Sequence, residues 1–304
     1  MIKVVISISL FIFSSILNSQ KKGNELRDNG ELEKAIKAYK KEIKIAGSNY
    51  ERNYNVACIY AIMYKKDSAF HYLNIALKNH KTLWPLSDND LYPLTDDKRW
   101  LAIEDKLLKN NQLIENNIID IEYTKKLLRL IMKDQVLDYH MDMAKKYFYK
   151  LSKAPHWYYP IAQMKKEIAS ENYNTMEKLI ADKGWPKYSK VGKIAADAPL
   201  LVINHHTDDH VRVKYIDIIK ENCLNNEGSC LEFAKIKDRI LVNANKEQLY
   251  GMQFTYDDQR NLIPFPIQNP ELVDQRRKEI GLEPLKKYLK RKINYDFNVA
   301  QTKI

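Results

Sequence analysis

Apolar residues recur three to four positions apart over most of this sequence. This spacing places apolar side chains on one face of an α-helix. The spacing is clear between residues 118 and 182, for example at Leu127, Leu128, Ile131 and Met132. The pattern therefore predicts a chain built mainly of amphipathic helices.

Residues that end helices divide this pattern into segments. A long helix is expected over 161–183, because Gly184 and Pro186 follow it and both residues terminate helices. Three further helical stretches are predicted near 195–206, 208–222 and 229–243.

The pattern changes near the C-terminus. Residues 247–267 predict two short strands around a turn at 257–261. After them, the Asn-Pro pair at 269–270 is expected to begin a helix, Gly281 to end it, and Pro284 to open a last one. The fold class expected is mainly α, with a small β-hairpin in the C-terminal domain.

The N-terminal part repeats itself with a period of 34 residues, which is the tetratricopeptide period. Small residues stand where two helices of such a repeat cross, and bulkier ones pack beside them. The matching positions are Gly23, Ala35, Tyr39 and Glu42 in the first copy and Ala57, Ala69, Leu73 and Ala76 in the second. Residues 21–108 thus resemble tetratricopeptide-type repeats.

Two repeats need a cap to bury a continuous core. The segment 84–108 is expected to fold back over the array and to end in a helix capped by Asp96 or Asp97. The polar, Asn-rich stretch 109–117 is interpreted as a linker.

The first residues have the layout of a signal peptide. One positive charge at Lys3 precedes an apolar run over 4–16, and polar residues follow at Asn18 and Ser19. The run is too short for a comfortable membrane span, and no cysteine stands near the expected cleavage after Ser19. The sequence predicts an exported protein, periplasmic or extracellular, with no stable membrane span.

Together these signals predict five parts: a signal peptide over 1–19, a repeat array with its capping helix over 20–108, a linker over 109–117, a helical domain with a β-hairpin over 118–291, and a tail over 292–304.

Composition narrows the class of protein. The 304 residues include only 8 glycines, which disfavours a sandwich or barrel with many tight turns. Lys and Arg exceed Asp and Glu by 50 − 39 = 11, but the lysines are spread along the chain, which disfavours a nucleic-acid partner. Attraction to an anionic envelope surface fits this charge better. The 20 tyrosines either fill contacts between helices or line a groove for glycan or peptide.

Three cysteines leave one pairing open. Cys58 lies in a helical apolar pattern and is expected to be a small core residue. Cys223 and Cys230 flank a polar break, and in an oxidising compartment they could form a disulfide or remain free thiols.

The C-terminal region carries a series of short motifs in a fixed order: KDQ at 133–135, ENYNT at 171–175, GWP at 184–186, LVINH at 201–205, KDR at 237–239, YGMQ at 250–253 and VDQRRKEIGLEPLKKYL at 273–289. Over 118–291 the chain resembles the family called domain of unknown function 6624. That resemblance implies no activity. Two positions depart from the family pattern, Asn204 where Gln is usual and Asp138 where Arg is frequent.

The string NHHTDDH at 204–210 offers possible metal ligands. On a helix His206 and His210 would lie four residues apart on one face. The alternative is a set of solvated loop histidines beside Asp208, which could cap the next helix. No third His or Cys stands at a supporting spacing, so neither a metal nor a cofactor is expected.

A second candidate site is formed by His205, Arg239, Tyr250 and Gln253, with Glu171 as a further member. Imidazole could act as a base, guanidinium could clamp an anion, and amide and phenol could orient a polar substrate. The alternative is structural: Arg239 would pair with Asp238 or Glu171, Gly251 would relieve crowding, and Gln253 would satisfy backbone groups.

The function expected from the sequence is an exported binding or scaffold protein whose repeat array engages a peptide or a partner protein. The alternative is a hydrolase-type enzyme with a polar site around His205, Arg239 and Gln253. Neither a nucleophile elbow nor a phosphate-binding loop is present in the sequence. The substrate, the partner and the oligomeric state are left open.

Overall fold

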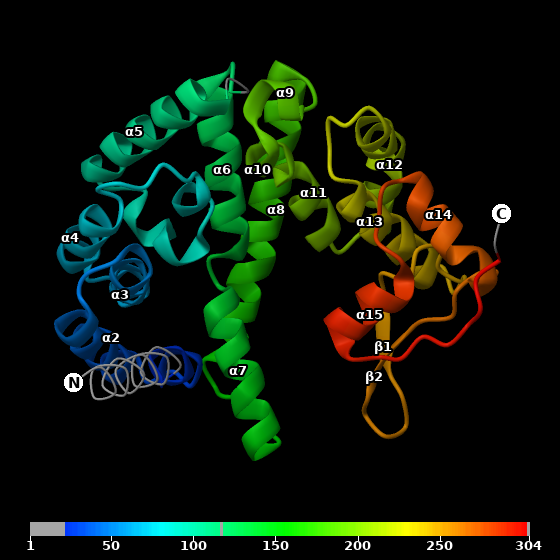
Figure 1. The fold of residues 1–304 in the computed structure, drawn as a ribbon, viewed down its shortest axis with the longest axis horizontal. Helices are drawn as coiled ribbons and strands as arrows, with labels where there is room; N and C mark the ends of the chain where they lie inside the picture. Colours follow the sequence, from blue (N-terminus) through cyan, green and yellow to red (C-terminus); the bar gives the residue numbers. More distant parts are fainter. Residues whose placement is uncertain (1–21, 116–117, 303–304) are drawn as a thin grey trace, which may run out of the picture. The chain divides into compact units, whose positions relative to one another are not determined.

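The computed structural model describes residues 22–115 and 118–302, and these residues are mainly helical with one small antiparallel sheet (Figure 1). The expected fold class is therefore confirmed. The predicted signal peptide and its cleavage after Ser19 lie outside the described residues, as do residues 116–117 of the predicted linker.

The chain divides into two compact units, Met1–Ile168 and Ala169–Ile304. In the first unit residues 22–28 are helical. The elements that follow are α2 (Leu32–Ala46), α3 (Tyr50–Ile62), α4 (Lys66–Ala76), η1 (Trp84–Leu86), η2 (Asn89–Leu94), α5 (Lys98–Glu115), α6 (Ile121–Gln135) and α7 (Asp138–Leu151), and α8 (Tyr158–Lys183) begins in this unit.

The second unit contains the rest of α8 and the C-terminal elements. These are α9 (Tyr188–Val191), α10 (Lys193–Ala196), α11 (Ala198–His205), α12 (Asp209–Leu224), α13 (Cys230–Asn243), β1 (Phe254–Tyr256), β2 (Leu262–Pro264), η3 (Pro270–Leu272), α14 (Val273–Glu279) and α15 (Leu285–Ile293).

The first four helices form two successive helical hairpins. The positions that recur 34 residues apart are buried in both hairpins. A Cβ atom added to Gly23 would lie 2.7 Å from the ring of Tyr39, so only glycine lets these two helices cross at this distance. α2 packs against α3, and α3 packs against both α4 and η2.

Helix α5 is longer than the sequence suggested, since it continues to Glu115 through most of the segment 109–117 expected as a linker. Helix α6, which was expected to begin the second domain, packs against η1 and η2. Glu104 of α5 also binds Arg129 of α6, with Arg129 Nε 2.7 Å from Glu104 Oε1. The first unit thus includes residues 118–168, which were expected in the second domain.

Sequence signals for helix ends are confirmed at several positions. α8 ends at Lys183, before Gly184, which has φ +78°. Asp97 Oδ1 accepts a hydrogen bond from Arg99 N at 3.0 Å at the start of α5, as expected of a capping residue. In the second unit β1 pairs antiparallel with β2 across the predicted turn.

Within residues 22–115 and 118–302, every helix is too short or too polar to cross a bilayer.

The open question about Cys223 and Cys230 is answered, because the two residues form a disulfide that joins the end of α12 to the start of α13. Cys58 is a free, buried thiol. The bridge closes a ring between helices that already pack against each other.

Removing this bridge is expected to lower the free energy of unfolding by about 2 to 3 kcal/mol, because a cross-link over seven positions limits the unfolded chain. Urea unfolding of a variant with Cys223→Ser and Cys230→Ser, followed by circular dichroism, measures the change. Dithiothreitol should reproduce the loss in the wild type and leave the double variant unaffected. A loss below about 0.5 kcal/mol would contradict the loop-entropy estimate.

Candidate functional site

A pocket of about 630 Å³ lies in the first unit. Four segments that are distant in the sequence line it: helix 22–28, α3, the stretch from η1 to η2, and α7. Pockets of this volume are typical of ligand sites. We therefore treat it as the candidate functional site of the first unit.

Aromatic rings form one part of the pocket lining. Tyr50 and Tyr54 stack with ring centroids 5.2 Å apart. The Tyr50 ring also stacks on the His80 ring, with centroids 4.0 Å apart. Trp84 also lines the pocket and is 57% exposed. Burial raises the pKa of Tyr50 to about 12, so its hydroxyl is neutral at ordinary pH. Tyr50 stacks on both Tyr54 and His80, so Trp84 is the ring of this group that is most exposed to a ligand.

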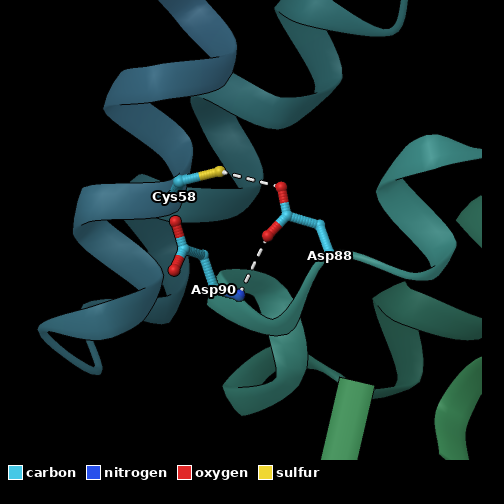
Figure 2. Close-up of side chains that lie close together, drawn as sticks. All are labelled: Cys58, Asp88 and Asp90. Carbon is cyan, nitrogen blue, oxygen red and sulfur yellow. Dashed lines mark hydrogen bonds between the residues drawn. The ribbon is translucent and has the colours of Figure 1, made fainter. Parts of the chain in front are cut away.

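Three side chains with possible ligand atoms meet in the pocket: Cys58, Asp88 and Asp90 (Figure 2). Tyr54 donates its hydroxyl hydrogen to Asp88 Oδ2 at 2.7 Å, and Cys58 Sγ lies 3.9 Å from the same oxygen. Asp88 Oδ1 also accepts from Asp90 N at 3.0 Å, which caps η2. The fold thus fixes the orientation of the Asp88 carboxylate.

Arg27 binds the carboxylate of Asp90. Its guanidinium forms an ion pair with Asp90, and the Tyr139 hydroxyl donates to the Arg27 carbonyl oxygen at 3.1 Å. Burial raises the pKa of Asp90 to about 6, although the Arg27 charge opposes this shift. Asp90 is therefore ionised at neutral pH and becomes protonated in mild acid.

The ligand atoms of Cys58, Asp88 and Asp90 lie within 4.8 Å of one another, so a metal ion is one conceivable ligand. One observation disfavours a metal held by all three groups, because the Arg27 guanidinium already forms an ion pair with Asp90. Burial also raises the pKa of the Cys58 thiol well above its usual value, so the thiol keeps its proton when no metal is bound.

The pocket is acidic although the whole chain is basic. Among the described residues that line it, two carry a positive side chain, Arg27 and Lys146. Six acidic residues line it: Asp28, Glu51, Asp88, Asp90, Asp138 and Asp142. With a formal charge of 2 − 6 = −4, the pocket contrasts with the charge of +11 for the chain. A local negative field of this kind attracts cations.

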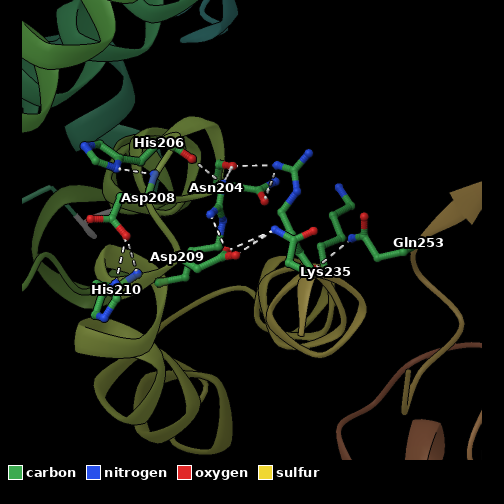
Figure 3. Close-up of polar contacts among 10 residues, drawn as sticks. Asn204, His206, Asp208, Asp209, His210, Lys235 and Gln253 are labelled. Atoms are coloured by element: carbon green, nitrogen blue, oxygen red, sulfur yellow. Dashed lines mark hydrogen bonds and ion pairs between the residues drawn. The ribbon is translucent and has the colours of Figure 1, made fainter. Parts of the chain in front are cut away.

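In the second unit, the structure brings Arg239 of α13 to the end of α11. Arg239 Nη1 donates to the Asn204 side-chain oxygen at 3.1 Å and to the Asn204 carbonyl oxygen at 2.5 Å (Figure 3). Arg212 donates to the same carbonyl oxygen at 2.9 Å. Burial and the nearby Arg212 charge lower the pKa of Arg239. His205, the next residue, ends α11 and is exposed.

Asp238, one residue before Arg239, binds backbone groups instead of Arg239, which the structural alternative paired with Asp238 or Glu171. It is fully buried, and its carboxylate accepts backbone N–H bonds from Leu249 at 2.8 Å, Tyr250 at 3.0 Å and Met252 at 2.9 Å. Asp238 thus holds the loop that contains the YGMQ motif.

The other polar groups of this loop are also engaged. Gln253 donates its amide to the Lys235 carbonyl oxygen at 2.9 Å, as Figure 3 shows. The Tyr250 ring packs edge-on against Phe233, with centroids 6.0 Å apart. Arg239 thus belongs to α13, and Tyr250 and Gln253 are held against the same helix by ring packing and by a bond to its backbone.

Arg277 and Gly251 complete this support. Arg277 is 1% exposed and donates to the carbonyl oxygens of Glu283, at 2.7 Å, and of Tyr250. Gly251 has φ +75°, and a Cβ atom there would lie 2.5 Å from Leu285. The KDR, YGMQ and VDQRR motifs thus build one packed junction of the second unit.

The histidines of the segment 204–210 lie between the end of α11 and the first turn of α12. Asp208 caps this helix, as the alternative interpretation expected, and it accepts from His210 N at 2.9 Å. His206 Nδ1 accepts from Asp208 N at 3.1 Å. Asp209 binds Arg212 and Asn243 (Figure 3). In the part of the chain that the structure describes, these side chains do not form a group of three metal ligands.

Sequence reasoning missed the pocket of the first unit. Cys58 was expected only as a core residue, and the segment with Asp88 and Asp90 only as a cap of the repeats. Asp88 and Asp90 stand in the polar run SDND at 87–90, a composition typical of a turn, so the sequence did not mark them as site residues.

Fold and pocket define a helical protein of two units, with an acidic aromatic pocket in the first and a motif-rich junction in the second. The chain belongs to the family of unknown function DUF6624, whose profile matches residues 140–299. That match begins after the KDQ motif at 133–135. No curated protein and no solved structure matches the chain.

Proposed function

We propose that this chain is an exported binding protein whose first unit takes a basic side chain of a peptide or partner protein. The observation that carries the proposal is the pocket of about 630 Å³, which combines aromatic rings with an excess of carboxylates. Lys and Arg side chains are attracted both by aromatic faces and by carboxylates.

The helical hairpins of the first unit supply the surface on which this pocket lies. We assign them to the tetratricopeptide type, because buried small residues recur at a spacing of 34 and Gly23 allows a close crossing of helices against Tyr39. Arrays of this kind commonly present surfaces for peptides.

Two features support export. The first 19 residues have the layout of a signal peptide. Cys223 and Cys230 form a disulfide, and structural disulfides persist in oxidising compartments such as the periplasm or the extracellular space.

The test is a titration of the purified protein with two fluorescent peptides of equal length, one carrying lysines and one carrying glutamates at the same positions. The lysine peptide is expected to bind at least about tenfold more tightly, since like charges repel the glutamate peptide. Asp88→Asn and Trp84→Ala should each weaken binding of the lysine peptide by about tenfold. The Asn side-chain oxygen can still accept from Asp90 N, and its amide can donate to the Tyr54 hydroxyl oxygen, so both contacts of this side chain can be kept.

Asp217→Asn is the matched control, because Asp217 is an exposed carboxylate on α12 in the other unit. It should leave the affinity unchanged. Binding should also weaken as the pH falls through about 6, because Asp90 gains a proton there while the peptide lysines stay charged. Equal binding of the two peptides, or unchanged binding by Asp88→Asn, would contradict the proposal.

A second candidate function is hydrolysis at the polar group around His205, Arg239 and Gln253. One observation favours it: Arg212 and Arg239 converge on the Asn204 carbonyl oxygen beside His205, and two close guanidinium groups attract an anionic substrate. This candidate predicts that His205→Ala abolishes any hydrolytic activity found with the purified protein, whereas the peptide-binding function is insensitive to that change.

A further inference from the structure

The turn between α7 and α8 exposes a group of large apolar side chains in the first unit. Each of them is at least 39% exposed, although large apolar side chains are usually buried. The group, which we call the aromatic tip, consists of Tyr147, Phe148, Tyr149, Leu151, Trp157, Tyr159 and Met164. In Figure 1 this end of α7 lies away from α2, α3, α4 and α5.

The same segment is strongly basic. Residues 143–166 contain six lysines and no Asp or Glu. One of the six, Lys165, forms an ion pair with Asp138 outside the segment, so the segment keeps an excess of positive charge. Lys150 and Lys153 stand at the turn itself and are exposed. Lysine and aromatic residues are therefore interleaved at the end of a helical hairpin.

A groove of about 440 Å³ runs along the tip. Phe148, Tyr149 and Tyr158 line it together with Ala144 and Ala154. Its lining is mainly apolar, apart from Asp142 and Lys145 at its edge. The tip thus offers a recess that is mainly apolar and has Lys145 in its lining.

The direction of the side chains indicates the kind of surface that they meet. Tyr147, Phe148 and Tyr149 are consecutive on a helix, so their side chains leave it about 100° apart. Side chains that point in three directions contact lipid together when the end of the hairpin enters the headgroup layer.

We propose that the aromatic tip binds the surface of an anionic lipid bilayer. Tyr and Trp side chains favour the interface between lipid headgroups and acyl chains. Lysines beside them are attracted to anionic headgroups and can extend toward them. Binding of this kind is peripheral and requires no membrane-spanning helix.

The test is sedimentation of the full chain with vesicles of phosphatidylcholine alone and with vesicles that also contain phosphatidylglycerol. The protein is expected to sediment with the anionic vesicles only, and less so in high salt. Lys150→Gln with Lys153→Gln should weaken binding by roughly 10- to 30-fold. Phe148→Ser with Trp157→Ser should weaken it to a similar extent, because exposed apolar area is lost.

The matched controls are Lys78→Gln with Lys81→Gln, and Tyr256→Ser, which change exposed residues outside the tip. They should bind as the wild type does. A second measurement is independent of any loss of fold: brominated lipids should quench the fluorescence of Trp157, one of four tryptophans, and the quenching should disappear in Trp157→Phe.

Three results would overturn the proposal. The first is equal sedimentation with and without phosphatidylglycerol, or none at all. The second is tight binding to polyphosphate that is unaffected by the change of Phe148 and Trp157, which would assign the tip to an acidic polymer. The third is self-association without vesicles that the same two substitutions remove, which would assign the tip to a second copy of the chain.

Discussion

Asp238→Ala is expected to destabilise the second unit by about 3 to 5 kcal/mol. The Asp238 carboxylate is fully buried and accepts backbone N–H bonds from Leu249, Tyr250 and Met252. Without it three donors lose their partner, and each buried donor left unsatisfied costs about 1 to 3 kcal/mol. The full sum is not expected, because water can reach part of the loop.

Urea unfolding followed by circular dichroism measures this change. The measurement belongs at pH 7, because burial raises the pKa of Asp238 to about 6 and the carboxylate is ionised above that value. Asp238→Asn keeps one acceptor oxygen and should be intermediate. Asp258→Ala, in the exposed turn between the strands, is the control and should change stability by less than about 0.5 kcal/mol. Equal stability of Asp238→Ala and the control would show that the loop is held by other contacts.

Glu104→Ala is expected to destabilise the first unit by about 2 to 4 kcal/mol. The Glu104 side chain is 3% exposed and accepts from Arg129, with Nε at 2.7 Å and Nη2 at 2.5 Å, and from Trp100 Nε1 at 2.9 Å. Alanine would leave the Arg129 charge and a buried indole N–H without their acceptor. Since Arg129 is partly exposed, water compensates some of the loss.

The same unfolding measurement tests this prediction. Glu122→Ala is the control, because Glu122 forms an exposed ion pair with Lys125 and such pairs contribute at most about 1 kcal/mol. Glu104→Met combined with Arg129→Met should be less destabilised than Glu104→Ala alone, since it removes the buried charge along with its partner. If Glu104→Ala and Glu122→Ala have equal effects, the buried pair does not stabilise the contact of α5 with α6.

The helical fold was largely predictable because local signals determine helix ends. Gly184 after α8 and Asp208 before α12 act through their own backbone conformation or their nearest neighbours. The break between α6 and α7 at residues 136–137 carries no Gly or Pro, so no local signal marked it. The attachment of α6 to the first unit was equally hidden, because it depends on the tertiary contact of Arg129 with Glu104.

The candidate sites were predictable to a smaller degree. The pocket brings Arg27 and Tyr139 together from positions 112 residues apart, and no spacing rule joins such positions. In the second unit the motif residues were identified, but their chemistry was ambiguous: an Asp beside an Arg predicts an ion pair, whereas Asp238 binds backbone and Arg239 binds Asn204. Which partner a polar side chain selects depends on packing that the sequence does not display.

The disulfide between α12 and α13 also bears on which cysteines pair while the chain folds. Three cysteines allow three pairings, and Cys58 lies 223 − 58 = 165 positions before Cys223, whereas Cys230 lies seven positions after it. Since the probability of ring closure falls as about the 3/2 power of chain length, the native pair is favoured roughly 100-fold in an unfolded chain. The correct bridge can therefore form without an isomerase. Cys58 stays a free thiol and becomes buried in the first unit.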